Sequence, residues 1–183
     1  MDIFSRKYIA ILLLLSAVAL LSFPRVSRAE APVEEKVKAA FIVNFARFIS
    51  WPEELFSNDT DPFVICTVGM DTEQAAFTGI ESKKIKGRPI VLKNLTSLDD
   101  KKQICHLLYV KGVSHEKLQA YLKKSETSPV VSICESDGFA ALGGTIEFVK
   151  VEDRLSFKIN NTKAKERQLR VNASLLNLAV EVF

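Results

Sequence analysis

The spacing of apolar side chains first predicts a helix. Four large apolar residues in the segment 32–49 fall on one helical face, at Val37, Phe41, Phe45 and Phe48. Between residues 39 and 49 only Asn44 and Arg47 are polar, so we expect this helix to be covered on more than one side. Trp51 and Pro52 end it, because proline disfavours the helical conformation of the residue before it.

Short, continuous apolar runs follow, separated by turns and short helical segments. We predict strands at 63–69, 90–92, 107–110 and 130–134. Helical segments are expected at 72–77, 97–102 and 115–124, the last with Ser114 as its N-cap. Strands this apolar are typical of a parallel sheet that is covered on both faces.

The pattern changes after residue 140. Segments 145–149 and 155–160 flank a turn at Glu152 and Asp153, and the second segment alternates apolar with polar residues. This pattern predicts a β-hairpin with one buried face. From about Lys163 to the C-terminus we expect one long helix, whose polar stripe comprises Arg170, Ser174, Asn177 and Glu181.

Together these elements predict an α/β fold. It is a three-layer domain with a mostly parallel sheet, a C-terminal β-hairpin and a long C-terminal helix. The chain has 183 residues, of which 48% are hydrophobic and 26% charged, and this excludes disordered and low-complexity classes. We expect residues 30–183 to form a single domain.

The first 29 residues carry the features of a secretory signal peptide. Arg6 and Lys7 precede an apolar run at 9–21, and small residues at Ser27 and Ala29 mark a cleavage site. The alternative is an uncleaved N-terminal anchor, although the apolar run is short for a membrane span. We therefore expect an exported protein that is cleaved after Ala29.

Removal of residues 1–29 changes the charge balance. The segment contains four of the 25 basic residues and one of the 22 acidic residues, which leaves about 21 of each and no formal net charge. The dense basic cluster at Lys83, Lys84, Lys86 and Arg88 is best interpreted as a solvated loop. A neutral domain lacks the electrostatic signature of nucleic-acid binding.

Three cysteines allow three single disulfide pairings in an exported chain. Cys66 lies in the first predicted strand and Cys105 directly before the third, and these strands are commonly neighbours in a doubly wound sheet. The pairing Cys66–Cys105 is therefore expected, with two separate buried thiols as the alternative. Cys134 is expected to be a buried free thiol.

Motifs of catalysis and cofactor binding are absent from the sequence. There is no glycine-rich nucleotide loop, no GxSxG and no CxxC or HExxH, and His106 and His115 are the only histidines. Cys105 and His106 are adjacent, and successive side chains of a strand point to opposite faces, which argues against a catalytic dyad. We therefore expect no enzyme, no cofactor and no metal site.

The remaining candidate residues lie between the fourth strand and the hairpin. Glu135 and Asp137 follow a strand end, where α/β folds often place ligand groups, although a solvated loop is the simpler interpretation. Arg154 is either a functional residue or a turn residue paired with Glu152 or Asp153. The candidate partner- or ligand-binding residues are Phe139, Gly143, Gly144, Arg154 and Asn160.

Five sequence elements in the same order resemble the YfiR family over almost the whole exported chain. They are residues 38–48 (KAAFIVNFARF), Trp51 and Pro52, 143–146 (GGTI), 154–160 (RLSFKIN) and 174–179 (SLLNLA). The resemblance implies a periplasmic, dimeric protein without catalysis of its own. It also implies repression of a membrane diguanylate cyclase by binding to its periplasmic part, and hence lower cyclic-di-GMP and less biofilm.

The resemblance implies further properties, and other interpretations stay open. An outer-membrane lipoprotein would sequester the repressor, and the Cys66–Cys105 disulfide would be a family feature. Similar domains are sensory modules of membrane kinases, so the protein is alternatively a periplasmic small-ligand sensor with a cleft near Glu135, Asp137 and Gly143. A hydrolase is the third possibility, and the missing nucleophile–base pair argues against it.

Overall fold

The computed structural model describes residues 33–70, 74–100 and 103–183, which belong to one compact unit. The predicted signal peptide and the first residues of the segment 72–77 lie outside the described residues, as do residues 101 and 102. Among the helices that are described, none is both long enough and apolar enough to cross a membrane.

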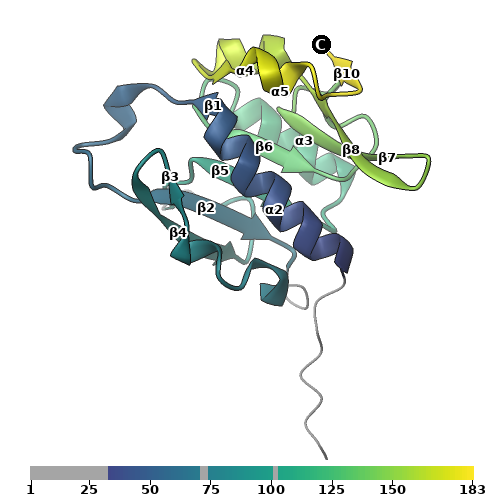
Figure 1. Ribbon diagram of the computed structural model, residues 1–183. Helices are drawn as coiled ribbons and strands as arrows, with labels where there is room; N and C mark the ends of the chain where they lie inside the picture. The colour runs from purple at the N-terminus through teal and green to yellow at the C-terminus, as the bar shows by residue number, and fades with distance from the viewer. Residues whose placement is uncertain (1–32, 71–73, 101–102) are drawn as a thin grey trace, which may run out of the picture. The chain divides into compact units, whose positions relative to one another are not determined.

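One mixed sheet forms the centre of the domain, in the strand order β10-β8-β7-β6-β5-β2-β4-β3. Five neighbouring strands run parallel, in the order β4, β2, β5, β6 and β7 (Figure 1). The strand β8 pairs antiparallel with β7, and β3 pairs antiparallel with β4. Their bounds are β2 Phe63–Val68, β3 Lys84–Ile85, β4 Arg88–Leu95, β5 Leu107–Val110, β6 Val131–Cys134, β7 Ile146–Val151, β8 Arg154–Ile159 and β10 Glu181–Val182. The predicted mostly parallel sheet is confirmed.

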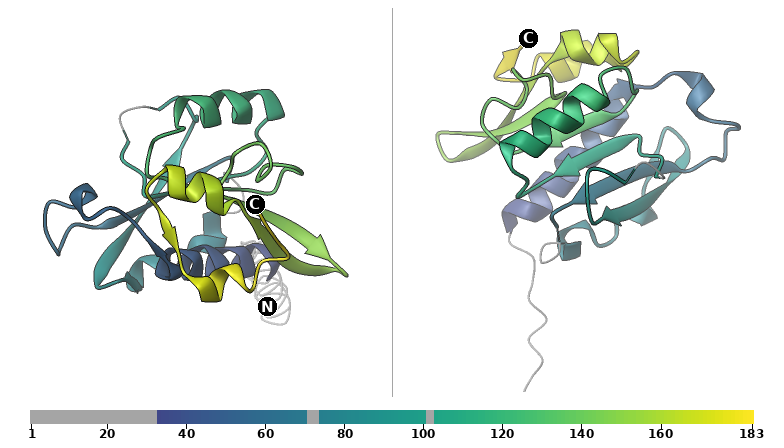
Figure 2. Two further views of the ribbon diagram at one scale, coloured as in Figure 1. Left: turned by 90° about the horizontal axis from the view of Figure 1, so that it is seen from above. Right: turned by 180° about the vertical axis from the view of Figure 1, so that it is seen from behind.

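Helices cover the two faces of this sheet. The helix α2 (Val33–Phe48) packs on one face, and α3 (His115–Lys124) packs on the other (Figure 2). The short 3-10 helices η2 (Gln74–Phe77) and η3 (Ile80–Ser82) contribute side chains to the same core as α2. The predicted three layers are therefore present, with a large core beneath α2 and a smaller one beneath α3.

The helix α2 confirms the predicted element but corrects its buried face. The buried apolar stripe comprises Ala39, Ile42, Val43, Phe45 and Ala46, whereas Val37 and Phe48 are 39% and 43% exposed. Phe41 and Phe45 pack edge to face against Phe157 of the hairpin, with ring centroids 5.9 and 4.8 Å apart. Helix α2 is thus covered by the sheet and the hairpin, and part of its apolar surface is exposed.

The predicted hairpin is confirmed as β7 and β8. Glu152 and Asp153 both adopt positive φ angles, 49° and 59°, which is the geometry of a type I′ turn. Aspartate tolerates this conformation better than most side chains, which favours Asp153 at the second position of a turn without glycine.

The predicted long C-terminal helix is wrong. The segment contains two short helices, α4 (Asn161–Glu166) and α5 (Ala173–Leu176), with the strand β9 (Arg170–Val171) between them. Gln168 has φ +60°, which breaks the helical path and turns buried Leu169 into the core. The strand β9 then pairs antiparallel with β1 (Ile49–Ser50), so that tertiary pairing overrides the local helical pattern.

Other differences concern the bounds of short elements. The strand β4 extends to both sides of the predicted run 90–92, because β2 pairs with it as far as Leu95 and β3 pairs with Arg88 and Pro89. Residues 97–100 form a turn and not the predicted helical segment. The 3-10 helix η1 (Glu53–Leu55) follows Trp51 and Pro52, and Ser114 precedes α3 without a side-chain capping hydrogen bond.

Candidate functional site

The disulfide between Cys66 and Cys105 is present. Cys66 lies in β2 and Cys105 lies just before β5, and their Cα atoms are 5.7 Å apart. The strands β2 and β5 are paired neighbours, as the topology argument required. Cys134 at the end of β6 is a buried free thiol, which confirms its expected state.

The structure brings four of the five candidate binding residues together in one loop region. Gly144 leaves no room for a side chain, because a Cβ atom there would lie 2.1 Å from the ring of Phe139. Gly143 has φ +105°, a conformation that side chains rarely adopt. The two glycines therefore permit a tight loop that closes over the buried Phe139 ring.

Asn160 ties this loop to the helix α4. Its Oδ1 atom accepts a hydrogen bond from the Lys163 backbone N–H at 2.8 Å, and its Nδ2 atom donates to the Ala140 carbonyl at 2.7 Å. Asn160 is only 7% exposed. Its amide is therefore occupied by capping a helix and fixing a loop.

Sequence reasoning missed two charged residues that hold the same loop. The Glu147 carboxylate accepts hydrogen bonds from the backbone N–H groups of Gly138 and Ala140, at 3.1 and 2.9 Å. The Arg167 guanidinium donates to the Gly143 carbonyl at 3.0 Å and to Thr145 Oγ1 at 3.2 Å. A glutamate between the apolar residues of a strand is the signal that could have found Glu147.

Arg154 lies apart from this loop region. It is exposed at the start of β8, and no ion pair joins it to Glu152 or Asp153 within the part of the chain described here. Since its guanidinium faces solvent on a hairpin, Arg154 is available to a partner and does not belong to the loop cluster.

A buried ionic network surrounds the other candidate, Glu135. The Lys38 ammonium is the centre of this network, and the residue as a whole is only 2% exposed. Its Nζ atom lies 2.9 Å from Glu34 Oε1, 3.1 Å from Glu35 Oε1 and 2.7 Å from Glu135 Oε2. Two carboxylates from the first turn of α2 and one from the residue after β6 thus share the Lys38 ammonium.

The end of β5 completes the network. The Tyr109 hydroxyl donates a hydrogen bond to Glu135 Oε1, and Lys111 Nζ lies 2.7 Å from Glu35 Oε1. Burial and the hydrogen bond to Glu135 raise the pKa of Tyr109, so its hydroxyl keeps its proton. Three elements of the fold therefore meet through side chains of opposite charge.

The electrostatics of the network favour the charged forms of Lys38 and Glu34. Burial opposes the charged form of Lys38, but the hydrogen bonds that its ammonium donates to the three carboxylates outweigh burial and raise the pKa of Lys38. Hydrogen bonds to Lys150 and Lys38 lower the pKa of Glu34 to about 2. Lys38 and Glu34 are consequently charged at neutral pH and form an ion pair.

Three carboxylates in this network approach metal-binding geometry. One oxygen each from Glu34, Glu35 and Glu135 lie within 4.8 Å of one another. The Lys38 ammonium already lies between these oxygens and supplies the positive charge that a metal ion would supply. The arrangement is therefore a lysine-filled carboxylate cluster and not an open metal site.

An open cavity of about 350 Å³ adjoins this network. Its lining includes Glu34, Lys38, Glu135 and Asp137, together with apolar side chains of β7 and β8 such as Phe148. Asp137 is exposed, whereas Glu135 is held by Lys38 and Tyr109. This cavity can bind polar groups, and Glu135 has a fixed ionic role and not that of a solvated loop residue.

His106 occupies a buried aromatic stack. Its ring lies between the rings of Phe56 and Phe63, with centroids 4.6 and 5.1 Å away. Nδ1 accepts a hydrogen bond from the Val64 backbone N–H at 2.9 Å, so the proton of the neutral ring is on Nε2. Burial and, less strongly, the Arg88 guanidinium lower the pKa of His106 to about 4.

The family to which the chain belongs follows from comparison with known proteins. The fold and the loop region define a small α/β domain, and the model of the YfiR/HmsC-like family matches residues 35–180. The chain belongs to this family. The resemblance that the sequence elements indicated is thereby confirmed.

Solved structures give a weaker likeness. The ABC domain from Streptococcus pneumonia in complex with L-Trp is 12% identical with a TM-score of 0.48, and covers 79% of this chain and 62% of its own. A conserved domain protein from Vibrio cholerae O1 biovar El Tor is 11% identical with a TM-score of 0.47, with coverages of 81% and 60%. This chain thus spans about 60% of the length of either structure. No curated protein matches the chain.

Proposed function

We propose that this protein is a periplasmic regulator without catalytic activity, which binds the periplasmic part of an inner-membrane diguanylate cyclase and represses it. The observation that carries the proposal is the match to the YfiR/HmsC-like family over residues 35–180. Repression would lower cyclic-di-GMP and biofilm formation. An outer-membrane lipoprotein that sequesters the protein would relieve the repression.

The chemistry of the described residues supports a binding role. Cys105 is held in a disulfide and His106 is buried as a neutral ring, so that neither is available as a nucleophile or a base. Asn160, Glu147 and Arg167 use their polar groups to hold the loop at Gly143 and Gly144. The polar groups of these three side chains are thus occupied in holding the loop.

Exposed apolar side chains in the C-terminal segment support association with protein. Leu178, Val180, Val182 and Phe183 are 67%, 49%, 46% and 38% exposed. They lie within six residues around the edge strand β10, and clusters of this kind mark interaction surfaces. A homodimer or the complex with the cyclase would bury this segment.

The test combines a deletion with a matched pair of variants. Deletion of the gene is expected to raise cyclic-di-GMP and surface attachment, and the wild-type gene is expected to reverse both. Leu178→Asp should fail to reverse them, because it places a charge in the C-terminal segment. Ile104→Asp is the control, since Ile104 is 68% exposed but lies in the β4–β5 connection.

Export is part of the same proposal. Protein recovered from the periplasm should begin at Glu30, and mass spectrometry measures this directly. An intact N-terminus in the membrane fraction would contradict cleavage. Unchanged cyclic-di-GMP on deletion, together with a strictly monomeric protein in solution, would contradict the repressor.

The second candidate function is that of a small-ligand sensor acting with a membrane kinase. The cavity of about 350 Å³ beside Glu135 and Asp137 favours it, because the cavity combines charged groups with an apolar wall. Ligand-induced shifts of the melting temperature with candidate metabolites test this alternative. Such shifts without any effect of deletion on cyclic-di-GMP would favour the sensor.

A further inference from the structure

A column of stacked side chains runs from the surface to the starts of β2 and β5. The Arg88 guanidinium lies over the Phe56 ring, 3.9 Å from its centroid, and Phe56 in turn stacks on His106. On the other side of His106, Phe63 is stacked at 5.1 Å and meets the Trp51 ring edge to face. Trp51 Nε1 also donates a hydrogen bond to the His106 carbonyl at 3.0 Å. The column therefore links a half-buried arginine to the core beneath α2.

The outer end of the column is covered by segment 56–61, which we call the latch. The Asp61 carboxylate closes the latch on itself by accepting hydrogen bonds from two of its backbone N–H groups, at 2.6 and 3.3 Å. Arg88 donates to two carbonyls of the latch, at 2.5 and 3.2 Å. Arg88 and the stack of Phe56 on His106 thus hold a preformed turn against the strands.

The hydrogen bonds of the His106 ring require its neutral form. Nδ1 accepts from the Val64 backbone N–H at 2.9 Å, so the single proton of the ring is on Nε2. Nε2 is buried and has no hydrogen-bond partner within the part of the chain that the structure describes. A second proton would be added to Nδ1, where it would face the Val64 N–H and break this bond. The buried ring would then carry a charge without a partner, which is strongly unfavourable.

Of the charged residues described, Arg88 and Asp61 act on the His106 ring. Arg88, from β4, opposes a positive charge on the ring, and Asp61, from the latch, favours it less strongly. Glu53 and Glu54 on η1 are exposed, so that solvent screens their charges. The neighbouring strands β2 and β6 contain no charged residue. The closed structure therefore does not compensate a protonated His106.

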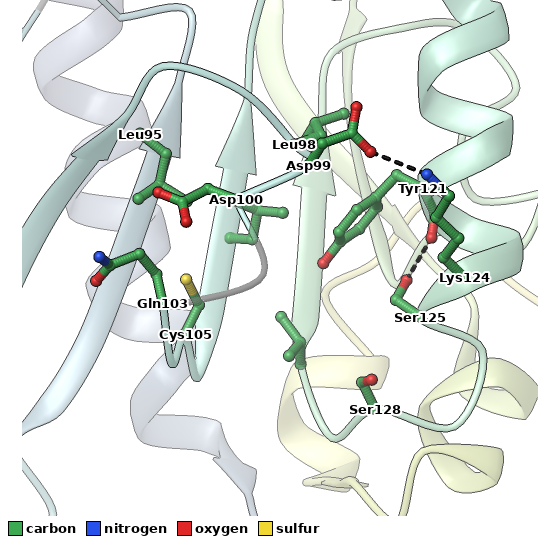
Figure 3. Close-up of a pocket in the computed structure, with 12 residues that line it drawn as sticks. Leu95, Leu98, Asp99, Asp100, Gln103, Cys105, Tyr121, Lys124, Ser125 and Ser128 are labelled. Atoms are coloured by element: carbon green, nitrogen blue, oxygen red, sulfur yellow. Dashed lines mark hydrogen bonds and ion pairs between the residues drawn. The ribbon is translucent and has the colours of Figure 1, made fainter.

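The backbone beside His106 is fixed from the opposite face of the sheet. Cys105 points to that face, into a cavity beside α3 that Leu98 and Tyr121 also line (Figure 3). Its disulfide with Cys66 ties the chain to β2 directly before β5 begins. Because the backbone is held in this way, a charged His106 ring reaches water by displacing the latch.

We propose that segment 56–61 is an acid-operated latch, which opens when His106 takes up a second proton. The proton comes from the solvent and breaks the hydrogen bond to Val64. The charged ring then moves outwards, displaces Phe56 and uncovers the Phe63 ring. Loss of the proton restores the stack, so that the device is reversible. It does not depend on the proposed regulatory function.

Hydrogen exchange of the Val64 amide measures the opening, because this N–H is released together with the His106 ring. The pKa of His106 is about 4 in the closed form against 6.5 for a solvated histidine, so protons favour the open form between these values. From pH 7.5 to pH 4.5 the opening constant should rise about 70-fold, and the protection factor of Val64 should fall by the same factor.

Denaturant separates this local opening from unfolding of the whole domain. Opening of the latch exposes little surface, so exchange of Val64 should be insensitive to low urea concentrations. Amides of β6, which exchange by larger unfolding, should accelerate with urea. Exchange of Val64 with the same urea dependence as β6 would overturn the proposal.

Three variants test the role of the histidine. His106→Asn does not titrate in this range and should lose the 70-fold response, although all carboxylates remain. His115→Gln removes the other histidine of the chain, at an exposed position of α3, and should keep the response. Phe56→Leu should raise the opening constant about three- to tenfold at pH 7.5, since stacked aromatic pairs have this worth.

Amide spectra at pH 7.5 show that each variant is folded. An equal pH response in His106→Asn, loss of the response in His115→Gln, or unchanged Val64 exchange in Phe56→Leu would each overturn the proposal. If His106→Asn does not fold, the urea dependence of the wild type and the exchange of Phe56→Leu decide the question.

Discussion

At the scale of single residues, Lys38 shows most clearly how the fold uses charge. Its ammonium is nearly inaccessible and neutralises carboxylates from α2 and from the end of β6. Removal of one partner from a buried ion pair leaves uncompensated charge. The stability of the whole domain thus depends on a residue that sequence alone would place on an ordinary helix surface.

We predict that Lys38→Met destabilises the protein by about 3–5 kcal/mol, because the carboxylates of Glu35 and Glu135 lose their shared cation. The same variant should gain a response to calcium, since three carboxylate oxygens within 4.8 Å would then lack the ammonium. Thermal unfolding with and without millimolar calcium chloride measures both effects.

The control for this prediction is Lys36→Met, at an exposed position of the same helix. It should change the melting temperature little and should not respond to calcium. A calcium response of the wild type as large as that of Lys38→Met would contradict the view that Lys38 fills the cluster.

His106 leads to a prediction about pH. The pKa of His106 is about 4 in the folded chain against 6.5 for an ordinary histidine, so the unfolded chain binds more protons between these values. The contribution of His106 to stability is therefore complete above pH 6.5 and is lost as the pH falls towards 4. Urea unfolding at pH 7.5 and at pH 4.5 should show a lower free energy of unfolding at pH 4.5.

The variant His106→Asn isolates this contribution, because asparagine does not titrate in this range. It should be less stable than the wild type at pH 7.5, and the difference between the two proteins should shrink at pH 4.5. A constant difference across this pH range would show that His106 is not the group responsible.

The candidate site could be predicted only in part, and the reason is visible at the residue scale. Gly143, Gly144 and Asn160 were found because glycine pairs and a polar residue at a strand end are local signals. The role of Glu135 depends on a hydrogen bond to Lys38 across 97 residues of sequence. Glu34, Glu35 and Lys38 have the spacing of ordinary surface pairs on a helix, so the burial of Glu35 and Lys38 was not visible.

At the scale of elements, the C-terminal segment shows where periodicity misleads. Residues 163–183 carry apolar and polar positions at helical spacing, but Gln168 has a positive φ and β9 pairs with β1. The strands and the hairpin were predictable, because continuous apolar runs and a two-residue turn are strong signals. Pairing between β1 and β9 is non-local, and no pattern within 163–183 reports it.

The break in this segment yields a prediction. Gln168→Gly should stabilise the protein by about 1 kcal/mol, because φ +60° is strained for glutamine and not for glycine. Lys165→Gly is the matched control, and should destabilise by about 1 kcal/mol because Lys165 lies within α4. Denaturant unfolding of both variants measures the two changes, and destabilisation by Gln168→Gly would contradict the assigned backbone conformation.

At the scale of the whole molecule, the disulfide connects the fold with the compartment in which the protein works. The bond joins β2 to the residues just before β5 across a sequence separation of 39, and the segment between the two cysteines includes all of β3 and β4. A crosslink of this span restricts the unfolded chain and contributes about 2–4 kcal/mol. An exported protein has access to the oxidising conditions in which this contribution is present.

We therefore predict that a reductant lowers the free energy of unfolding of the wild type by about 2–4 kcal/mol. The double variant Cys66→Ala, Cys105→Ala should already be less stable by a similar amount and should not respond to reductant. Cys134→Ala is the control, since Cys134 is a buried free thiol and its replacement should leave the response to reductant intact.

Peptide mapping without reductant should recover the Cys66–Cys105 pair. Two results would contradict this role of the disulfide. One is recovery of Cys134 in a crosslink, and the other is an unchanged free energy of unfolding of the wild type after the reductant has broken the bond.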